Sequence, residues 1–315
     1  MKTTLKVGLA LLALVAVARC QEAPLAQITF KVITDDRTPV AGVIVGMSTF
    51  VRWQPGDGFG KDIHDGPTAV TGKNGVVVLS YPSKTGEFGY QVRDLEGYYR
   101  DRGNDYRFTE QEAGRWQPWN PTIEIVFRKI EKPIAMYAKK VDLAMPAFEV
   151  PVGFDLVIGE WVAPYGKGKT SDLVFTAHLQ QRSKKDYDYE LAVTFSNAED
   201  GLQPFEAPPF YGSELKSPRL APENGYLPEW KQWRKRAPGK AEASNVSESR
   251  NYLFRVRTVL DDKGKLVSAL YGKIYGDFLR FTYYLNSTAN DRNIEFDPKQ
   301  SLYEGLRETE RVREP

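Results

Sequence analysis

The stretch PVAGVIVGM (residues 39–47) decides the fold of the first part of this chain, together with TGKNGVVVL (residues 71–79) further along. Both are short, apolar and bounded by glycine, which is typical of buried β-strands. In the second stretch, Asn74 and Gly75 tolerate the positive φ angles of a tight turn that leads into the β-branched run that follows. The two stretches therefore predict strands of a small β module.

Three further segments complete the strands expected around them. ITFKVI (residues 28–33) alternates apolar with polar side chains and ends in a polar turn that Pro39 closes. Segments 90–93 and 123–127 carry the same kind of pattern. Because every segment is short and separated from the next by turn residues, we expect a sandwich of two sheets over this part of the chain.

The pattern of these segments resembles the transthyretin-like, or carboxypeptidase regulatory-like, family of small β-sandwiches. The resemblance covers residues 28–129 and is carried by residues 39–45, residues 71–79 and Gly97-Tyr98-Tyr99. The family usually has Asp after the threonine of the second stretch, whereas Gly72 follows Thr71 here. The resemblance implies an immunoglobulin-like or transthyretin-like fold and an adhesive, spacer or ligand-presenting role.

Two inserts of the first module are rich in large aromatic side chains, which suit a stacking surface for a sugar or peptide. The ligand-binding candidates in these inserts are Trp53, Tyr106, Trp116 and Trp119. The alternative is that these rings pack on one another or on the second domain. Exposure of the three tryptophans on one flat surface would favour carbohydrate binding.

His64 lies close to three aspartates, namely Asp57, Asp62 and Asp65. Imidazole and carboxylate groups are metal ligands, but the chain has only 2 histidines and the aspartate spacing matches no calcium-binding loop. We interpret the cluster as a solvated turn and expect no metal and no cofactor.

Alternating segments recur after residue 150 and predict an antiparallel β-sandwich or open barrel. The segments are 154–158, 172–179, 187–195, 252–258, 266–275 and 278–285. Asp200-Gly201 and Lys263-Gly264 are interpreted as tight hairpin turns, the latter within a meander of the last strands. The charged tail predicts a frayed helix or a disordered end.

A proline-rich insert interrupts these strands at residues 201–249. Pro228 suits the first position of a helix, and Trp230 and Trp233 would then share one helical face with the cationic residues beside them. That face is the second candidate surface, for an anionic polymer, a glycan or a membrane. The alternative is that both tryptophans cover the sandwich.

The N-terminus has the pattern of a secretory signal. Lys2 and Lys6 precede an apolar run at residues 7–18 that is too short for a membrane anchor. Cleavage after Ala18 of an A-x-A site is one outcome. The other is a lipobox at residues 17–20, with Cys20 as a lipidated first residue, although Arg19 stands where a small residue is preferred. Periplasmic, outer-membrane-anchored and extracellular locations therefore stay open.

The composition limits the remaining classes of partner. Cys20 is the 1 cysteine in the sequence, so no intramolecular disulfide can form. A formal net charge of +2 over 315 residues does not favour nucleic acid. The partners that fit are a polysaccharide or an envelope protein, with a membrane contacted only through a lipidated Cys20.

No motif predicts catalysis, although an enzyme is not excluded. The GKGKT at residues 166–170 lacks the first glycine of a phosphate-binding loop and is interpreted as a hairpin turn. Glu149 with Asp155 or Glu160 could form a glycosidase pair, because only the fold sets their separation. A non-catalytic envelope or surface protein, a carbohydrate-binding accessory protein and a glycoside- or peptide-cleaving hydrolase are therefore the three hypotheses.

The predicted organisation is all-β with two domains. A signal peptide (1–20) precedes a transthyretin-like sandwich (25–130), and a larger antiparallel β domain follows (135–300). The proline-rich insert belongs to the second domain, and a charged tail (301–315) ends the sequence.

Overall fold

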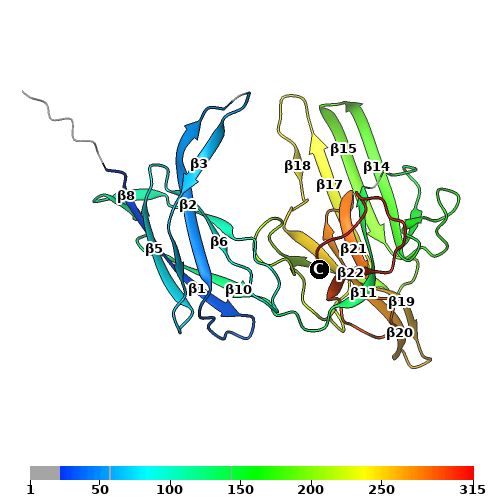
Figure 1. The fold of residues 1–315 in the computed structure, drawn as a ribbon. Helices are drawn as coiled ribbons and strands as arrows, with labels where there is room; N and C mark the ends of the chain where they lie inside the picture. The colour runs from blue at the N-terminus through cyan, green and yellow to red at the C-terminus, as the bar shows by residue number, and fades with distance from the viewer. Residues whose placement is uncertain (1–21, 57, 143) are drawn as a thin grey trace, which may run out of the picture.

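The computed structural model describes residues 22–56, 58–142 and 144–315. The predicted signal segment, Cys20 and Asp57 lie outside the described residues. The described residues form strands and no helix, and the strands assemble into four sheets in two modules (Figure 1). The predicted all-β, two-domain fold class is confirmed.

The first module is a sandwich of two sheets, drawn in blue and cyan in Figure 1. One sheet consists of β10 (Thr122–Phe127), β1 (Leu25–Thr34), β9 (Arg115–Gln117), β8 (Glu110–Glu112) and β5 (Val76–Pro82). The other consists of β3 (Lys61–Asp65), β2 (Ile44–Gln54), β6 (Glu87–Val92), β7 (Asn104–Arg107) and β4 (Thr68–Val70).

The turn before β5 shows why the second of the two opening stretches needs its glycine. Gly75 has a φ of +72°, and a Cβ there would lie 2.4 Å from the Val32 carbonyl oxygen. The Gly75 carbonyl accepts the Val32 amide hydrogen bond, so the turn is joined to β1. The alternating residues of β1, including Ile28 and Phe30, are fully buried between the sheets. The half-buried alternation read from the sequence is therefore present, with its apolar side in the core.

The second module also contains two sheets and is a sandwich rather than a barrel. One sheet has the order β16 (Gly201–Glu206), β19 (Arg250–Leu260), β20 (Leu266–Gly276), β21 (Arg280–Leu285), β11 (Ile134–Asp142), β22 (Phe296–Ser301). The other has the order β13 (Glu160–Trp161), β12 (Val152–Asp155), β14 (Leu173–Ser183), β15 (Asp186–Thr194), β17 (Trp230–Arg236), β18 (Ala243–Ser244).

The two turn predictions in this module had different outcomes. Lys263-Gly264 turns β19 into the antiparallel β20, and β21 pairs with β20, so the meander is present. Asp200-Gly201 is not a hairpin turn, because β15 and β16 lie in different sheets. Instead, the buried Asp200 carboxylate accepts hydrogen bonds from the backbone amides of Arg257 and Thr258. These bonds attach the segment between β15 and β16 to strand β19.

Apolar side chains lie on both faces of the sheet that contains β19 to β21. Phe254, Phe281 and their neighbours pack between the two sheets. On the opposite face, a second cluster includes Ala221 from the proline-rich insert and Val312 from the tail. The insert and the tail therefore cover a sheet face that would otherwise expose apolar side chains to water.

The C-terminal tail differs from its prediction. Its described residues form turns without a helix, and the Glu310 carbonyl accepts the Lys140 amide at 2.8 Å. Val312 is only 7% exposed. The charge pattern suggested disorder, but a single apolar residue and backbone hydrogen bonds to β11 hold the tail against the sheet.

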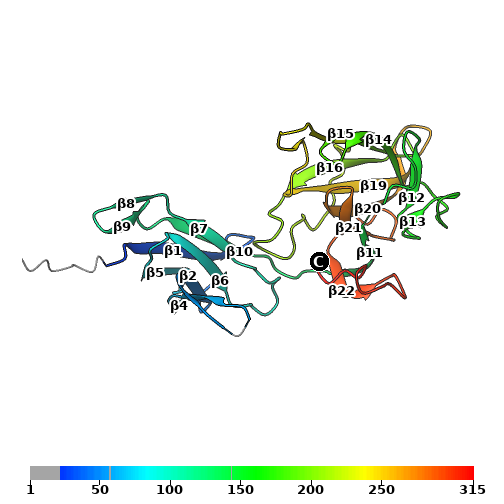
Figure 2. The same ribbon diagram turned by 90° about the horizontal axis from the view of Figure 1, so that it is seen from above.

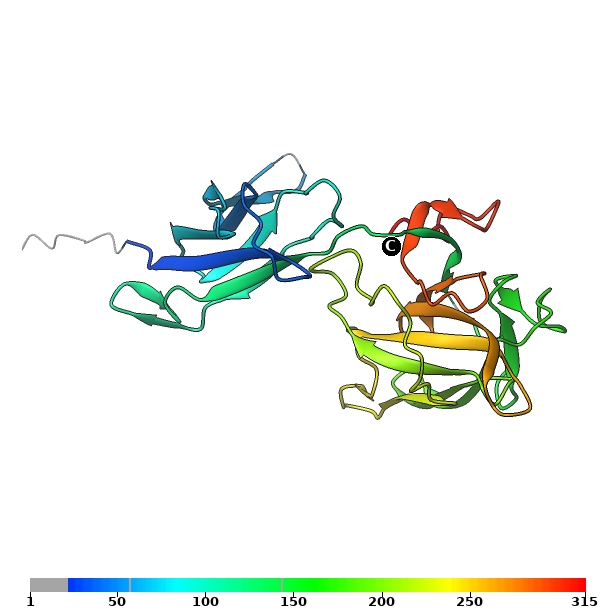
Figure 3. The ribbon, with the colours of Figure 1, turned by 90° about the horizontal axis from the view of Figure 1, so that it is seen from below.

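The proline-rich insert also contacts the first module, and Figures 2 and 3 show its loop beside that module. The Arg102 amide donates to the Gly212 carbonyl at 3.0 Å, and the Gly212 amide donates to the Gly103 carbonyl at 3.1 Å. The Arg128 guanidinium, which follows β10, donates to the carbonyls of Leu215 and Ser217. The insert thus extends the hydrogen-bonding of one module into the other.

A buried carboxylate lies at the centre of the junction. Glu295 is 1% exposed and accepts hydrogen bonds from the Tyr99 hydroxyl and from the amides of Glu131 and Lys132, at 2.8, 2.9 and 3.0 Å. Arg219 lies 4.0 Å from Glu295 and 2.6 Å from Asp35 of the first module. We call these contacts the Glu295 junction.

Within the described residues, no helix is long and apolar enough to span a bilayer.

Candidate functional site

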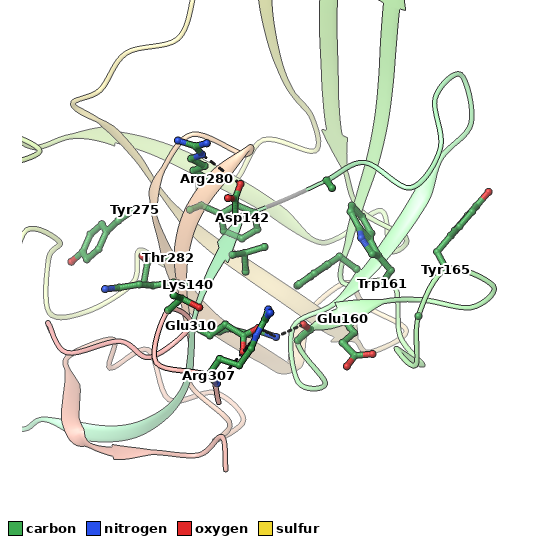
Figure 4. A pocket seen from close by; sticks show the side chains of 18 residues that line it. Lys140, Asp142, Glu160, Trp161, Tyr165, Tyr275, Arg280, Thr282, Arg307 and Glu310 are labelled. Carbon is green, nitrogen blue, oxygen red and sulfur yellow. Dashed lines mark hydrogen bonds and ion pairs between the residues drawn. The ribbon is translucent and has the colours of Figure 1, made fainter. Parts of the chain in front are cut away.

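A pocket of the described structure lies in the second module, between strands of its two sheets and the C-terminal tail. It has a volume of about 940 Å³. Residues from β11, β21, the β12–β13 segment and the tail line it, among them Lys140, Asp142, Phe154, Glu160, Trp161, Tyr165, Arg280, Phe281, Thr282, Arg307 and Glu310 (Figure 4). We call it the tail pocket.

The apolar part of the tail pocket is an extension of the sandwich core. Phe154 and Phe281 are each 3% exposed and form its floor. The half-buried ring of Trp161 packs edge-to-face on Phe154 and Phe175, at centroid distances of 5.5 and 5.6 Å. Edge-to-face contacts of this kind fix the orientation of an aromatic ring. Trp161 therefore presents a fixed aromatic surface to the pocket.

The polar part consists of charged side chains that already pair with one another. Lys139 Nζ donates to the Gly159 carbonyl at 3.0 Å and lies 3.3 Å from a Glu310 oxygen. Arg307 binds the same carboxylate at 3.0 Å. Hydrogen bonding from Arg307, with a further contribution from Lys139, lowers the pKa of Glu310 to about 2. Glu310 is therefore ionised at neutral pH and fixes both cations.

The carboxylates considered for glycosidase chemistry have separate surroundings. Glu149 pairs with His178 on the exposed face of β14. Asp155 is 2% exposed and accepts the amides of Val157, Ile158, Lys169 and Thr170. Burial acts to raise the pKa of Asp155, but these amide hydrogen bonds outweigh it and lower the pKa. Only Glu160 of the three lines the tail pocket.

Asp155 belongs instead to an ion-pair network inside the second module. Arg257 binds Asp172 at 2.7 Å and Asp155 at 3.3 Å, and the Asp172 side chain is fully buried. Arg257 has a φ of 55°, in an irregular stretch of the β19–β20 pairing. This network joins β12 and β19 to Asp172, the residue directly before β14, and has a structural role.

The structure does not bring the candidate aromatic residues of the first module onto one surface. Trp53 is 57% exposed on the projecting β2–β3 hairpin. Trp116 is 6% exposed and donates to the Ser83 carbonyl from the core. Trp119 lies under the Arg115 guanidinium at 4.6 Å, and Tyr106 packs on Phe108. The single flat surface that would favour carbohydrate binding here is not formed.

The predicted helix at Trp230 is wrong. Residues Trp230–Arg236 form strand β17, which pairs with β15 from Val193 to Tyr187. Trp230 therefore lies on the core side, against Tyr252 at 5.3 Å, while Trp233 lies on the opposite face. Two residues three apart share a helical face but not a strand face, so the proposed shared cationic surface is absent.

The remaining candidates are placed as follows. His64 packs against Phe50 on the β2–β3 hairpin, and Asp65 accepts a hydrogen bond from Tyr81. Across the described part of the chain, no group of three histidine, cysteine, aspartate or glutamate side chains is arranged to hold a metal ion. Cys20 lies outside the described residues.

The tail pocket was missed by sequence reasoning. Trp161 and Tyr165 lie in EWVAPYGKGKT (residues 160–170). The glycines of this segment indicated a turn, and its aromatic residues were not considered as a binding site. This segment does turn, with the Gly168 amide donating to the Trp161 carbonyl, but it is not a simple hairpin between two strands. The two aromatic residues directly before a glycine-rich turn were the signal in the sequence that could have indicated a binding site.

Comparisons with known proteins give no family assignment. No family model matches the chain, and no curated protein sequence matches it. The chain resembles a streptococcal ancillary pilin at 13% identity and a TM-score of 0.24, over 81% of this chain and 60% of that one. It resembles a shaft pilin of Lactobacillus rhamnosus GG at 12% identity and a TM-score of 0.25, over 75% of this chain and 89% of the pilin. A putative carbohydrate binding protein from Bacteroides uniformis is 10% identical to this chain with a TM-score of 0.17, and the match covers 85% of this chain and 99% of that one.

Proposed function

We propose that this protein is exported and acts at the cell envelope or cell surface as a non-catalytic binding protein whose ligand occupies the tail pocket. The observation that carries the proposal is the combination of a fixed Trp161 ring with charged groups already held in ion pairs. Pockets with an apolar lining and a few oriented polar groups are the usual form of a ligand site. The signal-like residues 7–18 support export.

The first module is proposed to be a transthyretin-like spacer that presents the second module. The Glu295 junction supports this part, because a buried carboxylate with three donors resists bending between the modules. Domain limits of 25–130 and 135–300 are kept as part of the proposal: the buried cluster of the first module spans Ala26 to Phe127 and the inter-sheet cluster of the second spans Phe154 to Leu285, with Val312 of the tail packed on the second module. A polysaccharide or another envelope protein is the proposed partner, with Cys20 as the proposed lipid anchor where it is retained.

The test is a binding screen with the protein as processed by its producing cell. Affinity electrophoresis through polysaccharides and pull-down on peptidoglycan and on envelope proteins would identify a ligand. The expected result is retention that Trp161→Ala reduces and that the exposed hairpin variant Phe59→Ala leaves unchanged. Retention that depends on Trp53 and not on Trp161 would place the site on the first module and contradict the proposal.

A further inference from the structure

We propose that the ligand of the tail pocket is a neutral oligosaccharide, one ring of which stacks on Trp161. This inference rests on the proposed function, because it names the ligand class of the same site. A sugar ring has one or two apolar faces of C–H groups and a rim of hydroxyls that each donate and accept hydrogen bonds. The ligand must therefore meet an aromatic surface and several oriented polar groups at once.

The tail pocket supplies both parts on facing walls. Figure 4 shows Trp161 on the β12–β13 side, with Asp142, Arg307 and Glu310 on the side formed by β11 and the tail. Trp161 is half-buried, so part of its ring remains available while Phe154 and Phe175 hold the rest. An aromatic ring held in this way contributes contact area with little loss of conformational entropy on binding.

The charges favour hydroxyl groups over a polyanion. The cations lining the pocket are Lys139, Lys140, Arg280 and Arg307, and the anions are Asp142, Glu160 and Glu310, which gives 4 − 3 = +1. Most of these charges are already paired: Glu310 with Lys139 and Arg307, and Asp142 with Arg280 at 3.4 Å. Paired carboxylates and guanidinium groups still have free lone pairs and N–H groups for hydroxyls. A polyanion would compete with Glu310 and Asp142 for the cations that these carboxylates bind.

The backbone around the pocket argues against an extended peptide that binds by strand addition. Such a peptide needs a strand edge with free N–H and C=O groups. β11 pairs with β21 from Tyr137 to Asp142, and on its other side the Lys140 amide donates to the Glu310 carbonyl of the tail at 2.8 Å. At the edge strand β13, the Trp161 carbonyl accepts the Gly168 amide at 2.8 Å, and the Val162 amide donates to Gly153 at 2.8 Å. These backbone groups are engaged within the protein, which favours recognition by side chains over strand addition.

The experiment compares ligand classes on the same protein. Neutral oligosaccharides, acidic oligosaccharides and extended peptides are titrated by calorimetry into the processed protein, into Trp161→Ala and into Arg307→Ala. Arg307 is 80% exposed, so its removal should leave the fold intact even if Trp161→Ala is destabilising. Arg311→Ala is the matched control, since Arg311 lies on the same tail, pairs with Glu308 and does not line the pocket.

The expected result is binding of a neutral oligosaccharide that weakens at least about tenfold in Trp161→Ala and several-fold in Arg307→Ala. Arg311→Ala should bind as the unaltered protein does. Binding of peptides or of acidic glycans alone, lost in the same two variants, would overturn the ligand class and leave the proposed function standing. Oligosaccharide binding that both variants retain would overturn the site. Absence of binding by every class would contradict both proposals.

Discussion

The hydroxyl of Tyr99 in the first module donates a 2.8 Å hydrogen bond to the carboxylate of Glu295 in the second. The two residues are 196 positions apart in the chain, and Glu295 is 1% exposed. Burial and the hydrogen bond to Glu295 raise the pKa of Tyr99 far above its usual value, so the phenol remains a donor at any ordinary pH. This contact, with the two backbone amides that share Glu295, fixes how the modules meet.

Replacing Glu295 should loosen the junction. In Glu295→Ala the Tyr99 hydroxyl and the amides of Glu131 and Lys132 lose their acceptor, and Arg219 loses a nearby negative charge. We expect the free energy of unfolding to fall by about 3 kcal/mol, as for other broken buried pairs. Limited proteolysis should become faster at residues 128–134.

The control for this variant is Glu304→Ala, because Glu304 is an exposed tail residue. It should unfold and be cleaved as the unaltered protein is. Equal protease resistance of Glu295→Ala and Glu304→Ala would show that Glu295 does not hold the modules together.

Lys273 should make stability depend on pH. Its side chain is fully buried between the rings of Tyr275 and Tyr284, with Nζ 3.1 Å from the Ser217 hydroxyl. Burial lowers the pKa of Lys273 from 10.5 to about 7. Repulsion from Arg128 adds to this effect, and attraction from Glu295 opposes it.

The sign of this effect follows from proton binding. Between pH 7 and pH 10.5 the unfolded chain binds more protons at Lys273 than the folded protein, so stability should rise with pH. Chemical denaturation at pH 7, 8 and 9 measures this slope. Lys273→Met should be more stable at pH 7 and should have a smaller slope, because methionine fills the site without a charge. An unchanged slope in Lys273→Met would assign the pH dependence to other groups.

Arg257 should be a large contributor to the stability of the second module. In Arg257→Ala the buried carboxylates of Asp155 and Asp172 lose their cation, and we expect a loss of about 3 kcal/mol in the free energy of unfolding. Arg182 also binds two aspartates but is 53% exposed, so Arg182→Ala should cost less than about 1 kcal/mol. Similar midpoints for the two variants in urea denaturation would contradict the structural role of Arg257.

The two tryptophans of β17 should respond differently to substitution. Trp230 packs on Tyr252 and the core, so Trp230→Ala should cost about 3 kcal/mol. Trp233 lies on the outer face, and Trp233→Ala should cost clearly less. Thermal unfolding of both variants, followed by circular dichroism, measures the difference. Equal losses would favour the helical face read from the sequence over the strand.

The sequence predicted the strands well where burial alternates along one segment. Residues 28–33 and 252–258 fall within β1 and β19 for this reason. It failed at residues 230–236, because Pro228 and the tryptophan spacing are local signals, whereas pairing with β15 depends on residues some 40 positions earlier. It failed at the tail because Val312 is one apolar residue among charges, and its burial requires the sheet face to be present.

The candidate site could not be predicted for a related reason. Phe154 and Trp161 come from one sheet, Phe281 from the other, and Arg307 with Glu310 from the tail. No segment carries a recognisable share of the pocket, so only the folded chain brings these side chains together. The aromatic residues of the first module were predicted to form a binding surface because they are numerous in two inserts. Trp116 is buried in the core of that module instead.

A crystal structure of the processed protein, grown with the oligosaccharide that binds best in solution, would show where the ligand lies. We expect a sugar ring stacked on Trp161, with hydroxyls within hydrogen-bonding distance of Glu310, Arg307 or Asp142. A sugar bound at Trp53 on the β2–β3 hairpin, with the tail pocket unoccupied, would contradict this expectation.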